Sequence, residues 1–265
     1  IENGQMLVDG GKIVAIGSDL SAQAQGAERV DLAGHWVVPA FITANTAMGL
    51  TEIETVRGSV DVAEIGAVNA NARAEVAVNA ESELLPVARA NGVLYAHVVP
   101  QVAEGGVIAG QSALIQLQGW TWAEMTVRTG VGLHLVWPSS RLPPSLPAMM
   151  REEALKGAQQ ALKNIDKAFD QAQAYEAAAQ AGTLGGTDAR LEAMRGVLEG
   201  KQRLFIHAVE LKQIREVLDF TRERGLKFTL VGGQDAWRVA EELKAREVPV
   251  ILHGPYDLPL RRHEG

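Results

Sequence analysis

The sequence predicts an α/β fold in which a small β region precedes a parallel sheet, either closed as a barrel or left open and doubly wound. Hairpin patterns open the chain, and apolar strands alternate with helices towards its C-terminal end. The composition, 47% hydrophobic and 22% charged, is that of a globular protein. Strand–helix alternation is typical of βαβ units, whose right-handed repetition can close a barrel. Periodicity alone leaves both architectures open.

Composition restricts the partners. The 265 residues carry a formal net charge of −7, so nucleic acid is not an expected partner and a small molecule is. The absence of cysteine excludes disulfides and thiolate metal sites, and it fits cytoplasm and periplasm equally. No apolar stretch reaches the roughly 18 residues of a membrane span.

The first elements are expected to be antiparallel hairpins. Residues 5–17, QMLVDGGKIVAIG, place two β-rich runs around Asp9-Gly10-Gly11, a sequence that tolerates positive φ. Residues 28–38 repeat the pattern around Ala33-Gly34. Two hairpins are therefore predicted before residue 39.

Helices and strands follow along the remaining chain. Helices are predicted at 83–91, 149–181, 188–200, 211–225 and 235–248, and strands at 93–100, 112–117, 130–138, 203–210, 226–233 and 249–254. The segment 139–147 is rich in proline and is expected to be a loop. Apolar residues at helical spacing predict one buried stripe on the longest helix: Leu155, Leu162, Ile165 and Phe169.

The segments DGGKIVAIG and VDLAGHWVVPAFI resemble the amidohydrolase superfamily. Ala40 stands where the family pattern has glycine. Segments 83–93 and 105–125, with RLFIHAVE and LVGGQDAWRVAEEL, are similar to the imidazolonepropionase-related branch, and within it to uncharacterised bacterial amidohydrolase-like proteins. The residues that match the family's entry into its barrel are Val30, Asp31, Leu32, Gly34, Val38, Pro39, Phe41 and Ile42.

The resemblance implies a small N-terminal β-sandwich over 1–37 and a TIM-like (β/α)8 barrel over 38–265. Both are expected to be incomplete, because the sandwich lacks its first strand and the chain stops soon after the seventh barrel strand. A barrel without its last strand exposes parallel edges, which proteins avoid. A completing chain or a homo-oligomer is one expectation, and an unclosed architecture is the other.

The resemblance also implies a divalent metal, Zn²⁺ first, and hydrolysis of a carbon–nitrogen bond other than a peptide bond in a small, cyclic amide. The family's first strand ends in His-x-His, and here Thr43, Asn45 and Ala47 stand near those positions. His207 occupies the place of the histidine on the fifth strand. The aspartate of the eighth strand has no counterpart in the sequence.

The candidate metal ligands are His207 and His253, each at a strand end, where such barrels place their chemistry. The alternatives are a buried histidine bonded to a carbonyl for His207 and a turn cap for His253. His97 and His134 are more typical of satisfied core residues. GxSxG, kinase and dinucleotide signatures are absent.

The candidate substrate-binding residues are Asn45, Gln111 in the Gly-rich segment 105–113, and Arg261 and Arg262, whose planar donors suit a carboxylate. The alternatives are a neutral replacement at Asn45, a bulged turn at 105–113, and an exposed charged loop at Arg261 and Arg262. Two functions follow: a metal-dependent amidohydrolase, or a catalytically deficient, metal-free relative that binds a small molecule or a partner subunit.

Overall fold

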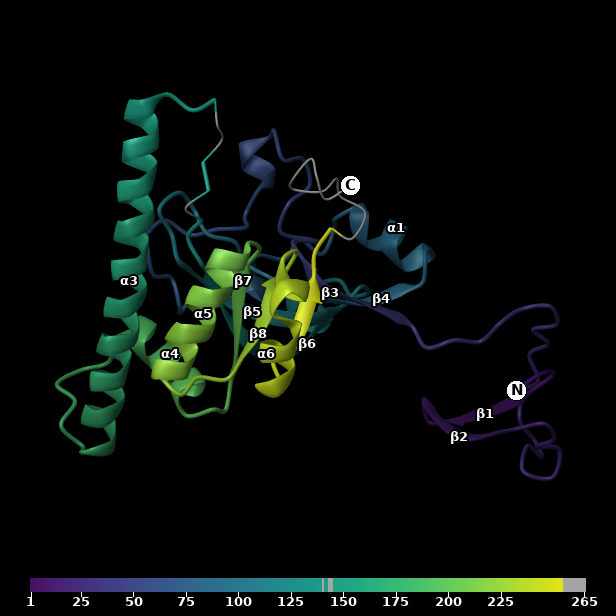
Figure 1. Cartoon of the computed structure of the whole chain (residues 1–265). Helices are drawn as coiled ribbons and strands as arrows, with labels where there is room; N and C mark the ends of the chain where they lie inside the picture. Colours follow the sequence, from purple (N-terminus) through teal and green to yellow (C-terminus); the bar gives the residue numbers. More distant parts are fainter. Residues whose placement is uncertain (140, 143–144, 255–265) are drawn as a thin grey trace. The chain divides into compact units, whose positions relative to one another are not determined.

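The computed structural model describes residues 1–139, 141–142 and 145–254. The chain divides into two compact units, Ile1–Pro39 and Ala40–Gly265. Figure 1 shows the fold of each unit. Within the described residues, no helix is long and apolar enough to cross a membrane.

The N-terminal unit contains one antiparallel hairpin, β1 (Gln5–Asp9) and β2 (Lys12–Gly17). Gly10 and Gly11 form its turn with φ of 54° and 75°, as the sequence predicted. The second predicted hairpin, at 28–38, is wrong: these residues form only a turn at Ala33-Gly34 and no strand. No neighbouring strand pairs with this stretch, and its Trp36 is 92% exposed. The unit's described part is a two-stranded sheet, so the sandwich stays a prediction.

The larger unit is built on a seven-stranded sheet with the order β3-β4-β5-β6-β7-β8-β9. Six strands point the same way, and β5 is antiparallel to both of its neighbours. The strands are β3 (Phe41–Thr46), β4 (Val93–Val98), β5 (Ile108–Gln116), β6 (Thr126–Val136), β7 (Arg203–Ala208), β8 (Phe228–Gly232) and β9 (Val250–Leu252).

The antiparallel β5 corrects the expectation of a sheet built only from βαβ units. The strands predicted at 112–117 and 130–138 exist, but they form a hairpin. A parallel connection needs a crossover of about a dozen residues, and only α2 (Trp122–Met125) with its short flanks links β5 to β6. Among the described residues β3 and β9 are the two edges of the sheet.

Three short helices between residues 57 and 125 were not predicted, and the others agree with the sequence-based expectations except near the C-terminal end. There the region 235–248 divides into a 3-10 helix and a short α-helix. In Figure 1, α3 and α4 lie beside each other, with α5 nearby. The helices are η1 (Arg57–Ser59), η2 (Ala74–Ala77), α1 (Leu84–Ala90), α3 (Ala148–Gln180), α4 (Ala189–Leu198), α5 (Leu211–Glu223), η3 (Ala236–Val239) and α6 (Ala240–Ala245).

The main core lies between one face of this sheet and the helices. Leu133 and Leu135 of β6 and Leu204 and Ile206 of β7 are all fully buried there. From α3, Ile165 and Phe169 of the predicted stripe are buried and Leu162 is partly buried, whereas Leu155 is 39% exposed. The stripe continues instead through Ala168, Ala172 and Tyr175.

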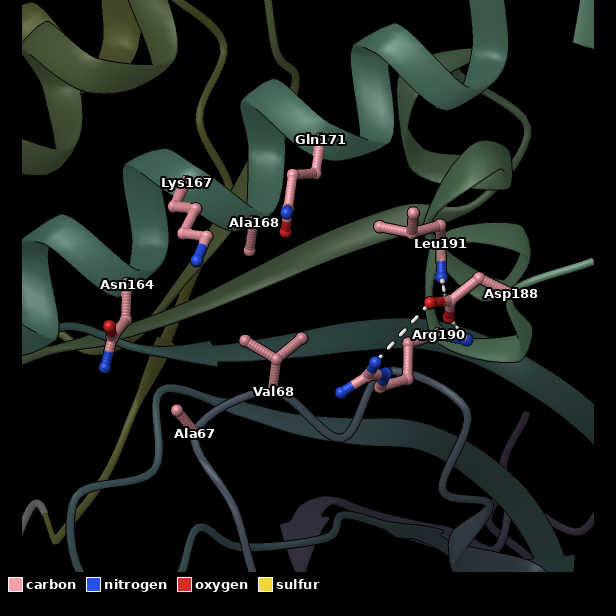
Figure 2. Close-up of a pocket in the computed structure, with 9 residues that line it drawn as sticks. All are labelled: Ala67, Val68, Asn164, Lys167, Ala168, Gln171, Asp188, Arg190 and Leu191. Carbon is pink, nitrogen blue, oxygen red and sulfur yellow. Dashed lines mark hydrogen bonds and ion pairs between the residues drawn. The ribbon is translucent and has the colours of Figure 1, made fainter. Parts of the chain in front are cut away.

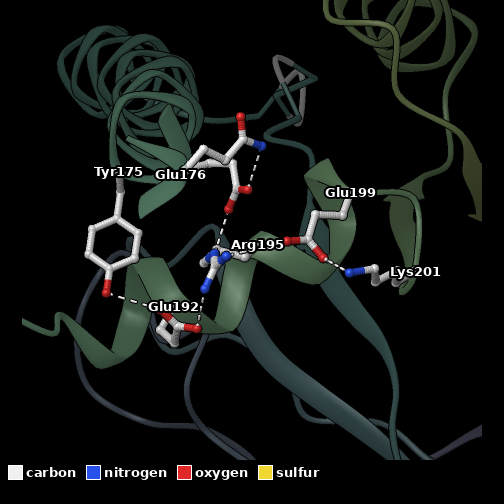
Figure 3. A network of polar contacts seen from close by, with 7 residues as sticks. Tyr175, Glu176, Glu192, Arg195, Glu199 and Lys201 are labelled. Carbon is white, nitrogen blue, oxygen red and sulfur yellow. Dashed lines mark hydrogen bonds and ion pairs between the residues drawn. The ribbon is translucent and has the colours of Figure 1, made fainter. Parts of the chain in front are cut away.

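A polar network joins α3 to α4 (Figure 3). The Arg195 guanidinium of α4 donates to Glu176 of α3 at 2.5 Å and to Glu192 at 2.8 Å, and Glu199 lies 3.4 Å away. The Tyr175 hydroxyl donates to Glu192 at 3.0 Å. These bonds hold α4 beside the C-terminal end of α3.

Candidate functional site

Three histidines gather on the face of the sheet that is turned away from the helices. His97 lies on β4, His134 on β6 and His207 on β7. Successive side chains of a strand point to opposite faces. Because the leucines and isoleucine of β6 and β7 pack under the helices, the intervening histidines point to the other, inner face. The ring centroids of His134 lie 5.6 Å from His97 and 5.2 Å from His207.

His97 is held at both ring nitrogens. Its Nδ1 lies 2.8 Å from the Ala44 carbonyl oxygen, which can only accept, so Nδ1 carries a proton. In the neutral ring Nε2 then accepts from the Ser112 hydroxyl, 2.7 Å away. Burial lowers the pKa of His97, and this favours the neutral ring at pH 7. These two hydrogen bonds of the ring thus fix the tautomer of His97.

His134 and His207 share one hydrogen bond, with Nδ1 of His134 2.9 Å from Nε2 of His207. Burial lowers the pKa of His207 to about 4, and the nearby His253 and His97 add to the effect. Burial also lowers the pKa of His134 well below its usual value. Both rings are therefore neutral at pH 7, the form that can bind a metal or accept a proton.

Phe205 orients the His134 ring. The two rings stack with centroids 4.7 Å apart and planes within 5°. Gly132 provides the space, because a Cβ at this position would overlap the Phe205 ring and lie 2.8 Å from the Arg203 carbonyl oxygen. The stacked ring restrains the direction in which Nδ1 of His134 points.

Several buried side-chain atoms of the described residues lack hydrogen-bond partners, and two of them lie near the carboxyl ends of β3 and β6. Nε2 of His134 and Oδ1 of Asn45 are buried, and neither has a hydrogen bond to any residue the structure describes. Most buried polar groups in folded proteins are hydrogen-bonded, so an unpartnered one needs an explanation. Space for a bound ligand, ion or water is the explanation that a functional site would supply.

The structure brings together some of the predicted site residues. His207 lies in the cluster, and His253 is exposed after β9, close enough for its charge to lower the pKa of His207. Asn45 is on β3, with its oxygen buried. Ala47, at a His-x-His position, packs against the apolar cluster around Leu85 and supplies no ligand.

Gln111 does not join the histidines. It pairs with Leu133, whose neighbour His134 points to the inner face, so Gln111 lies on the outer face. There its Oε1 accepts from Gln202 at 3.2 Å and its amide lies 3.4 Å from the Ala70 carbonyl. Its role in substrate binding has no geometric support. Arg261 and Arg262 lie outside the described residues.

Sequence reasoning treated His97 and His134 as core residues and so missed the nearest neighbours of His207. The available signal was alternation. In GLHLV and LFIHA, a histidine alternates with leucine or isoleucine, so it shares no face with the apolar core. Strand adjacency, which the sequence does not give, decides that the two histidines meet.

No family model matches this sequence, and no curated protein matches it. Among solved structures, the chain is similar to an amidohydrolase from Thermotoga maritima MSB8, with a TM-score of 0.82 and 21% sequence identity over 97% of this chain and 67% of that one. The chain has an amidohydrolase-like fold. At this identity the likeness establishes the fold alone, and the imidazolonepropionase-related branch stays a prediction.

Proposed function

We propose that the chain is a metal-dependent hydrolase of the amidohydrolase type, acting on a non-peptide carbon–nitrogen bond of a small, cyclic amide. One observation carries the proposal. In an amidohydrolase-like fold, His207 ends a strand on the inner face and meets a second neutral imidazole, His134, at 2.9 Å. Such barrels carry their chemistry at the carboxyl ends of their strands.

The donors present fit part of a zinc site. A catalytic zinc takes three protein ligands, and the described residues include no group of three or more His, Cys, Asp or Glu side chains that could hold an ion. We propose His207 and His253 as two of the ligands and the buried Asn45 oxygen as a substrate contact. A bound cation would polarise the substrate carbonyl and activate water.

The chain's own residues fix the orientation of the imidazoles. His134, fixed by Phe205, holds Nε2 of His207 in place. The fixed tautomer of His97 places a proton on Nδ1 and leaves its Nε2 bonded to Ser112. Neutral rings at pH 7 are suited to binding a cation.

A metal-free relative that binds a small molecule or a partner is the second candidate. The observation in its favour is the first strand, where Thr43, Asn45 and Ala47 stand in place of the ligand pair. This candidate keeps the polar inner face of the sheet and carries out no hydrolysis.

The test is metal content, measured by elemental analysis on protein purified without a chelator. The first proposal predicts about one equivalent of Zn, Fe or Mn, lost in His207→Ala and retained in His35→Ala, a matched control at an exposed histidine of the N-terminal unit. Hydrolysis of a panel of cyclic amides should follow the metal. A folded wild-type protein without metal would overturn this proposal and support the second candidate.

A further inference from the structure

We propose that a groove on the helical side of the larger unit binds a small ligand carrying a phosphate or carboxylate group. The groove lies between α3, the segment 67–68 and the start of α4 (Figure 2). It is lined by residues other than the inner-face histidines, so it is a second site and does not depend on the proposed hydrolysis. Its volume is about 250 Å³, just below the range of about 300–1,000 Å³ for ligand sites, so the ligand must be small.

One side of the groove is a row of donors on α3. Asn164, Lys167 and Gln171 recur at helical spacing and share one face, and Figure 2 shows their ends pointing into the same space. Oδ1 of Asn164 accepts a bond from Gln160 at 3.1 Å, which leaves its NH₂ group for a ligand. The Lys167 ammonium forms no ion pair with any described residue.

Arg190 supplies a second cation from α4. Its guanidinium is 3.4 Å from Oδ2 of Asp188, and it has further N–H groups that can donate. Asp188 is already engaged, because its Oδ1 caps α4 by accepting from the backbone N–H groups of Arg190 at 2.9 Å and Leu191 at 3.4 Å.

The charge balance favours an anion. Two cations and one engaged carboxylate line the groove, a net charge of +1, on a chain with a net charge of −7. Val68, Ala168 and Leu191 add apolar side chains to the lining, from three sides, for the uncharged part of the ligand. A mixture of convergent polar donors and apolar side chains is the usual composition of a small-molecule site.

Calorimetric titration of the 265-residue chain with inorganic phosphate, at constant ionic strength, tests the proposal. We expect saturable binding that Lys167→Glu weakens by at least about tenfold, the factor expected when a charge-assisted hydrogen bond is lost. Lys156→Glu makes the same charge change at an exposed position of α3 about three helical turns before Lys167, and it should leave the affinity within about twofold, because salt screens charges that lie beyond about 10 Å.

Further arms separate this site from the histidines. His207→Ala should bind phosphate as tightly as the wild type, and a thermal melt should show that Lys167→Glu folds normally, since Lys167 is exposed. Acetate, titrated in parallel, distinguishes a carboxylate from a phosphate preference, and saturable binding of either supports the proposal. Absence of saturable binding of both, equal weakening by the two lysine variants, or loss of binding in His207→Ala would overturn it.

Discussion

The two faces of β6 and β7 differ in how their side chains are satisfied, although alternating residues of the same two strands form both. On the outer face Leu135 and Ile206 are fully buried by packing under the helices. On the inner face His134 and His207 are also largely enclosed, but their nitrogens bond to each other and one nitrogen is left unpartnered. Packing alone accounts for the outer face and leaves the inner one incompletely satisfied. The outer face maintains the fold, and we propose that the inner face carries the chemistry.

The largest expected effect is at the outer face. Ile206→Ala removes a fully buried side chain from the main core, and it should lower the free energy of unfolding by about 2–5 kcal/mol. Urea unfolding measures this loss. The neighbouring His207→Ala should cost less stability but abolish metal binding, while Ile206→Ala should keep the metal content of the folded fraction. The comparison fails if His207→Ala is the more destabilising change.

A smaller loss of stability is expected from Gly132→Ala, which adds a methyl group on the inner face of β6. The added Cβ overlaps the Phe205 ring, so the ring must move, at a cost of about 1–3 kcal/mol in unfolding free energy. Because Phe205 stacks on His134, the side-chain NMR signals of His134 should shift. Gly157→Ala, at an open position on α3, is the matched control and should shift none of them. An unchanged His134 signal in Gly132→Ala would contradict the claim that Phe205 orients the His134 ring.

Most elements of the larger unit could be predicted because their signals are local. Gly92 and Gly200 mark the ends of α1 and α4, and the helical spacing of Ile165 and Phe169 marks the buried side of α3. The hairpin prediction at 28–38 failed because turn residues between β-rich runs do not ensure that the runs pair. The antiparallel direction of β5 was also missed, because the sequence of a short apolar strand does not show its direction in the sheet.

The candidate site was only partly predictable. His207 was identified through a family resemblance, and its closest partner, His134, was assigned to the core because a histidine in an apolar run looks the same in either role. The groove had no sequence signal. Lys167 and Arg190 are separated in the sequence by the last turns of α3 and the loop before α4, and only the packing of α4 against α3 brings them to one space.

The most direct measurement is a pH titration of the histidine side chains by ¹H–¹⁵N NMR. The enclosed inner face predicts that His207 titrates at about 4, below its ordinary value of 6.5, and that His134 also stays neutral well below 6.5. Unfolded histidine binds protons near 6.5, so the stability contributed by His207 is full above that pH and is lost as pH falls from 6.5 towards 4. Titration of His134 and His207 at or above 6.5, with no loss of stability in that window, would contradict an enclosed pair of neutral imidazoles.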